Sequence, residues 1–93
     1  MDRAELIRIL KQNGDSIINY NSSKSGKYRY TVCTTDFGTK YIKEKGEPRE
    51  RSDGSVLVFA WDADSFKHID PANVTSVQPL SSELQNRNPL GDY

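Results

Sequence analysis

Few side chains in this chain of 93 residues belong to the types that catalyse reactions. His68 is the only histidine and Cys33 the only cysteine, and their spacing does not indicate a nucleophile beside its base. A lone histidine next to Lys67 is typical of a partly exposed strand residue. A lone cysteine within a strand is typical of a small buried apolar side chain. We therefore expect no nucleophilic catalysis.

Asp62 and Asp64 form the pair of carboxylates whose spacing suits a shared divalent cation. No third carboxylate follows at the spacing of a metal-binding loop, and the glycines are too scattered for a phosphate-binding loop. Aspartates at a turn also hydrogen-bond their own backbone, and this is the role we assign to them. A metal-assisted enzyme at this pair ranks third among our hypotheses. We expect a non-enzymatic protein with no metal and no cofactor.

A group of lysines, arginines and tyrosines between residues 24 and 51 is more informative. If strands at 28–35 and 39–44 are neighbours, these side chains share one surface, where rings stack on bases and cations neutralise phosphates. Alternation along 28–35 places Tyr28 and Tyr30 opposite Arg29, so the tyrosines also fit a core-facing set, the reading that we favour. The candidate macromolecule-binding residues are Lys27, Tyr28, Arg29, Tyr30, Lys40, Tyr41, Lys43, Arg49 and Arg51.

The charge distribution limits which partner these residues recognise. The chain has a formal net charge of zero, but residues 24–51 hold eight bases against four acids, and residues 52–93 hold two bases against six acids. Such a dipolar chain can steer a charged partner, whereas net neutrality opposes strong non-specific binding to nucleic acid. We expect a small regulatory module that binds another protein. The alternative is a nucleic-acid-binding module that uses the basic and tyrosine-rich surface of residues 24–45.

The elements that position these residues begin with a helix over 2–13. Asp2 and Glu5 resemble a capping box, four apolar residues follow on one face, and Asn13-Gly14 is a helix stop. Alternating apolar residues and turn dipeptides then predict strands at about 16–20, 28–35, 39–44, 55–61, 66–69 and 74–77.

The strand over 55–61 is the most apolar segment of the chain, and we expect it to be buried on both faces at the centre of the sheet. Asp70-Pro-Ala-Asn73 predicts one turn of tight helix before the last strand. Together these elements predict a mainly β, α+β fold. An N-terminal helix precedes a small antiparallel sheet of five to six strands, either an SH3-like partly open barrel or a curved sheet. Residues 1–84 form a single domain and 85–93 a flexible tail.

Three further expectations concern context. The sequence has no apolar segment of membrane-spanning length and no N-terminal signal, so we expect a cytoplasmic protein without membrane contact. Its size suits the accessory proteins that phages and mobile elements encode, and exposed strand edges would allow a homodimer. We expect Trp61 in the core, with an interface anchor as the alternative.

Overall fold

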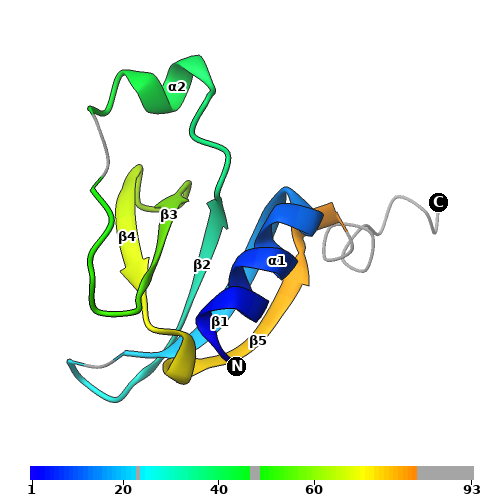
Figure 1. Cartoon of the computed structure of the whole chain (residues 1–93), viewed down its shortest axis with the longest axis vertical. Coiled ribbons are helices and arrows are strands. Elements are labelled where there is room, and N and C mark those ends of the chain that lie inside the picture. Colours follow the sequence, from blue (N-terminus) through cyan, green and yellow to red (C-terminus); the bar gives the residue numbers. More distant parts are fainter. Residues whose placement is uncertain (23, 47–48, 82–93) are drawn as a thin grey trace, which may run out of the picture.

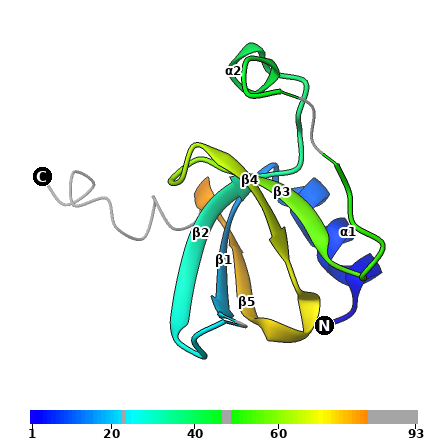
Figure 2. The same ribbon diagram turned by 90° about the vertical axis from the view of Figure 1, so that its left-hand side faces the viewer.

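The computed structural model describes residues 1–22, 24–46 and 49–81, in which an N-terminal helix precedes one antiparallel five-stranded sheet (Figure 1). The sheet is curved and does not close, as the second view shows (Figure 2), so the expected α+β fold with a curved sheet is confirmed. The strand order is β4-β3-β2-β1-β5. The elements are α1 (Arg3–Asn13), β1 (Asp15–Asn21), β2 (Tyr28–Thr34), α2 (Lys40–Lys43), β3 (Val56–Ala60), β4 (Ser65–Ile69), the 3-10 helix η1 (Pro71–Asn73) and β5 (Val74–Pro79).

Helix α1 forms as its sequence predicts. The Asp2 carboxylate accepts a hydrogen bond of 2.8 Å from the backbone N–H of Glu5, and Gly14 ends the helix at a φ of 78°. Leu6 and Leu10 lie on the face of α1 that packs against β1, β3 and β5. An isolated helix of this length is marginal in water, so this packing stabilises it.

The main core lies between α1 and one face of the sheet. Its fully buried members come from α1 and from four strands, namely Leu6, Leu10, Ile18, Cys33, Val56, Val58 and Ile69. Each large apolar side chain buried here contributes roughly 1.5–3 kcal/mol. The helix is therefore part of the core, not an appendage to the sheet.

Strand β3 is buried on both faces, as expected, because its five residues are all buried. Val56 and Val58 face the main core, whereas Phe59 belongs to a separate cluster of aromatic rings. The ring of Phe59 meets those of Trp61 and Phe66 edge to face, with centroids 5.1 and 5.2 Å apart. β3 is not the centre of the sheet, however, since β2 holds that position.

The predicted strand at 39–44 is wrong, because this segment forms helix α2 and the sheet has five strands. A side-chain hydrogen bond from the N–H of Gly38 to Asp36 closes a turn, and Thr39 then begins the helix. Within α2 only Ile42 is buried, so a single turn of helix satisfies the one apolar side chain of the segment. Of the strands predicted at 16–20, 28–35 and 39–44, only the first two therefore form, as the hairpin of β1 and β2.

The one-turn helix predicted at 70–73 is present as η1, with the Asp70 carboxylate accepting from the N–H of Ala72 at 3.0 Å. No helix among the described residues is long and apolar enough to cross a membrane. The predicted tail at 85–93 lies outside the described residues.

Candidate binding surface on the outer face of β1 and β2

The fold separates the predicted site residues into three groups. Lys27, Tyr28, Arg29 and Tyr30 belong to the β1–β2 hairpin, whereas Lys40, Tyr41 and Lys43 belong to α2, and Arg49 and Arg51 to the loop before β3. The turn of the hairpin and α2 lie at opposite ends of the molecule in both ribbon views (Figures 1 and 2). One continuous surface of bases and tyrosines over residues 24–45 is therefore not formed.

The expectation that the tyrosines of β2 face the core is wrong. Tyr28 and Tyr30 are 64% and 63% exposed, whereas Thr31 and Cys33, on the other side of the strand, are fully buried. The side of β2 opposite the tyrosines belongs to the main core, where Cys33 lies in one cluster with Leu6 and Leu10 of α1. The small side chain of Cys33 fits this cluster, and the larger tyrosines lie on the opposite, exposed side of the strand.

The neighbours of these tyrosines are uncharged. Asn21 pairs with Tyr28, Asn19 with Tyr30, and Ile17 with Val32. We call the surface formed by these six residues the outer face. No acidic residue occurs between Ser16 and Thr35, and the bases of that segment are Lys24, Lys27 and Arg29.

Trp61 lies at the far end of the outer face, in the turn after β3. Its indole N–H donates a hydrogen bond of 2.9 Å to the carboxylate of Asp15, and its ring packs edge to face on Phe59. With 36% of its surface exposed, Trp61 is neither a fully buried core residue nor a free anchor. It links the aromatic cluster to the outer face.

The pairing of β2 with β3 is short. It covers only Cys33 with Ala60 and Thr34 with Phe59, although β2 pairs with β1 along its whole length. After these pairs, the N–H of Trp61 donates to the carbonyl of Val32 at 2.7 Å. The Asp62 carboxylate then accepts from the backbone N–H of Val32 at 3.2 Å and from the hydroxyl of Thr31 at 2.8 Å. Asp62 thus ends the ladder, and β3 turns away from the first half of β2.

Helix α2 carries its own small aromatic and basic group. The ammonium of Lys40 lies 5.3 Å from the ring centroid of Tyr41, which is 63% exposed. Lys45, just after the helix, forms an ion pair of 2.8 Å with Asp64, and this contact raises the pKa of Lys45. The predicted role of Asp62 and Asp64, hydrogen bonds to their own turn, is therefore wrong: Asp64 pairs with a lysine, and Asp62 bonds to Thr31 and to the backbone of β2.

A hollow of about 490 Å³ lies beside β4, between the end of β1 and the loop before β3. Lys24, Arg51 and Lys67 line it together with Asp53 and Asp70. Both acids also serve turns: Asp70 caps η1, and Asp53 accepts from the N–H of Ser55 at 3.0 Å. Hydrogen bonding with the side chain of Ser55, and then with its backbone, lowers the pKa of Asp53. Lining residues of both signs do not define one class of ligand.

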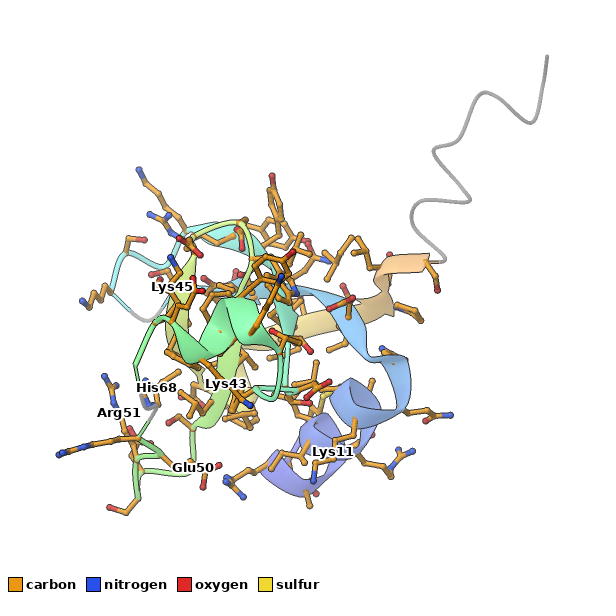
Figure 3. The ribbon with its side chains drawn as sticks, turned by 90° about the horizontal axis from the view of Figure 1, so that it is seen from above. Lys11, Lys43, Lys45, Glu50, Arg51 and His68 are labelled. Atoms are coloured by element: carbon orange, nitrogen blue, oxygen red, sulfur yellow. The ribbon has the colours of Figure 1, made fainter. Side chains whose placement is uncertain are left out.

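His68 and Arg51 line that hollow and lie on the same side of the molecule, whereas Lys11 lies on the other side, at α1 (Figure 3). A ring nitrogen of His68 is 2.9 Å from the carbonyl oxygen of Arg49, which holds the loop against β4. Sequence reasoning missed that Lys67 and His68 line a hollow, because the hollow also needs residues distant in the chain, such as Tyr20, Lys24 and Arg51.

The thiol of Cys33 is buried and unreactive. Burial, with smaller contributions from Asp62 and Asp15, raises the pKa of the Cys33 thiol to about 12. A thiol with such a pKa is not a nucleophile at neutral pH. Within the three described ranges, no group of three or more histidine, cysteine and acidic side chains is placed to hold a metal ion.

Comparison of the chain with family models, with curated proteins and with solved structures found no match.

Proposed function

We propose that this protein is a small binding and regulatory module that recognises another protein through its outer face. The observation that carries the proposal is the exposure of Tyr28 and Tyr30 on one face of β2. Their cross-strand neighbours on that face are uncharged. Protein interfaces are enriched in tyrosine and tryptophan and depleted of charge at their centres, with charged residues at the rim. The outer face has an uncharged centre of this kind, and Asp15 lies at the end of it, where its carboxylate binds the indole of Trp61.

The architecture supports the same class. We propose that the curved sheet is an SH3-like partly open barrel, a reading supported by the strand order β5-β1-β2-β3-β4 and by the 3-10 turn between β4 and β5. Such small barrels present loops and strand faces to their partners. The proposal retains the cytoplasmic location and the non-enzymatic role inferred from the sequence.

The test compares two tyrosine variants of the full chain. Replacing Tyr28 and Tyr30 together by serine should lower the affinity for a captured protein partner by about tenfold or more, since buried aromatic anchors contribute most of the binding energy of an interface. Tyr41→Ser is the matched control, because Tyr41 is equally exposed but lies on α2. Partners are captured from nuclease-treated lysate and their affinities are measured with purified variants. Equal losses in the two variants, or no loss in either, would remove the outer face as the interface.

A second candidate, binding of single-stranded nucleic acid, is favoured by one observation. The hairpin carries Lys24, Lys27 and Arg29 without any acid between Ser16 and Thr35, beside two exposed tyrosine rings. The contribution of α2 to this candidate is withdrawn, because α2 lies at the other end of the molecule.

Three phosphate contacts predict that affinity for a single-stranded oligonucleotide falls roughly 20-fold between about 50 and 200 mM salt. Fluorescence anisotropy with labelled single-stranded DNA and RNA measures this slope. Absent or salt-independent binding would reject the candidate.

A further inference from the structure

We propose that the edge of β2 from Tyr28 to Tyr30 binds an extended acidic segment of the partner protein, which adds to the sheet as a further strand. This inference rests on the proposed protein-binding function and names the form that the partner takes. Strand addition needs unpaired backbone groups on an accessible edge, with side chains that select the added strand. The first half of β2 supplies both.

The printed hydrogen bonds define which backbone groups of β2 are free. The N–H of Ser22 donates to the carbonyl of Lys27, so the odd-numbered residues of β2 direct their backbone groups toward β1. The bonds of Val32 to Trp61 and Asp62 lie on the opposite side, so the even-numbered residues face away from β1. β3 has turned away before Tyr30 is reached. The N–H and C=O groups of Tyr28 and Tyr30 therefore have no backbone partner on that side among the described residues.

The second ribbon view agrees with this assignment. The turn between β3 and β4 lies beside only the upper end of β2, and no other labelled strand borders that edge below it (Figure 2). Tyr28, Arg29 and Tyr30 are all exposed, which is unusual for consecutive residues of a central strand. Strand β2 is central by order, yet its first half is an edge.

The side chains of this edge specify an alternating partner. Tyr28 and Tyr30 point to the outer face, and Arg29 and Lys27 alternate to the other side of the strand. Residues of an added strand face the same way as their cross-strand neighbours. The strand that fits places apolar or β-branched side chains beside the tyrosines and acidic side chains beside the two cations.

Charge also decides against a second copy of this chain as the occupant. Antiparallel pairing of the edge with itself, centred on Arg29, would place each Arg29 opposite its counterpart. It would also gather both copies of Lys27 nearby. Like charges directly opposite each other destabilise a strand pair. Opposite charges in the same positions stabilise it, so an acidic segment is the occupant that the edge selects.

The first experiment uses a short peptide with blocked ends that alternates glutamate and valine. Its controls are the same peptide with lysine for glutamate, and the acidic peptide N-methylated at alternate residues so that it cannot bond to the edge. Amide hydrogen exchange of the full chain gives the readout. We expect the acidic peptide to slow exchange at Tyr28 and Tyr30 by about tenfold or more, whereas Arg29 and Thr31, bonded to β1, change little.

The second experiment compares Tyr30→Pro with Tyr30→Ser. Both remove the ring, but only proline removes the free N–H, and proline is tolerated where the N–H faces away from the neighbouring strand. We expect the proline variant to bind the acidic peptide about tenfold more weakly than the serine variant. Thermal unfolding shows that each variant is folded, and Tyr28→Pro repeats the comparison on the second free N–H.

Three results would overturn strand addition: equal affinity for the acidic, lysine and methylated peptides, no binding of the acidic peptide at all, or equal affinity of the proline and serine variants. These results differ from a failure of the proposed function. If the double serine variant loses its protein partner but Tyr30→Pro and Tyr30→Ser bind that partner equally, the outer face is the interface and strand addition is rejected. If the double serine variant keeps its partner, the proposed function itself fails.

Discussion

Replacing Asp62 by alanine should destabilise the protein by about 2 kcal/mol, although Asp62 is exposed. Its carboxylate accepts from the hydroxyl of Thr31 and the backbone N–H of Val32. Thr31 is fully buried, so alanine at position 62 leaves its hydroxyl without that partner inside the protein. A buried unsatisfied hydroxyl costs about 1–3 kcal/mol, and the lost bond of Val32 adds a smaller amount.

The measurement is urea unfolding at neutral pH, followed by tryptophan fluorescence. Thermal unfolding gives a second measure: in a domain of this size, a loss of about 2 kcal/mol lowers the melting temperature by roughly 8–16 °C. Asp64→Asn is the matched control from the same turn. Asparagine tolerates the left-handed conformation at that position, where φ is 51°, and only the exposed ion pair with Lys45 is lost. That loss should cost much less than the loss of Asp62, because solvent screens an exposed ion pair.

A double-mutant cycle with Thr31→Val separates the buried hydroxyl from other effects. Valine has nearly the same shape and no hydroxyl, so in this background Asp62→Ala no longer leaves an unsatisfied group. We expect Asp62→Ala to cost about 1 kcal/mol less in the Thr31→Val background than in the wild type. Additivity within about 0.5 kcal/mol would refute the role assigned to this hydrogen bond.

Three further predictions concern the core and the helix. Burial raises the pKa of the Cys33 thiol to about 12 from an ordinary value of 9.0, so above pH 9 the folded protein keeps a proton that the unfolded chain releases. The free energy of unfolding should therefore fall as pH rises from about 9 toward 12. In urea titrations at alkaline pH, Cys33→Ala should remove that part of the pH dependence. Phe59→Ala should cost about 3–5 kcal/mol by urea unfolding, and Trp61→Phe clearly less, because Phe59 is 1% exposed and Trp61 36%; equal losses would contradict the packing described. Asp2→Ala should cost about 1 kcal/mol through the lost bond to Glu5, with Asp2→Asn as the conservative control in thermal unfolding.

The elements that sequence predicted well are those whose local signals and burial agree. Helix α1 has a cap at Asp2, a stop at Gly14 and one apolar face, and β3 has five apolar residues between turns. In both, the pattern of side chains leaves one arrangement that buries them. The one-turn helix at Asp70 is equally local, since a cap followed by proline defines it.

The segment at 39–44 was mispredicted because it has one buried side chain, Ile42. A single apolar residue has no period, so alternation and helical spacing fit it equally well. Only the tertiary position of Ile42 decides, and that position is absent from the local sequence. The predicted single surface of bases and tyrosines depended on this strand, so the same error divided the candidate site.

The direction of the β2 tyrosines failed for a different reason. Alternation correctly separated Tyr28 and Tyr30 from Thr31 and Cys33, but it does not say which set is buried. Hydrophobic size favoured the tyrosines. The structure reverses that choice, because Cys33, and not a tyrosine, lies in the core cluster with Leu6 and Leu10 of α1. The sequence therefore separated the two faces of this strand, but only the packing of the core decided which face is exposed and can form an interface.

An open strand edge beside exposed aromatic rings is a hazard for a folded protein, since it invites pairing with other copies of itself. Natural proteins often protect such an edge with cations. Here Lys27 and Arg29 lie on the edge, and the sequence from Ser16 to Thr35 contains no acidic residue. The same two cations reject a like-charged copy and attract a segment of opposite charge. Protection and recognition therefore have one physical origin in this hairpin. Replacing Arg29 and Lys27 by alanine should both weaken an acidic partner and allow self-association, two effects that a purely solubilising role for these residues would not couple.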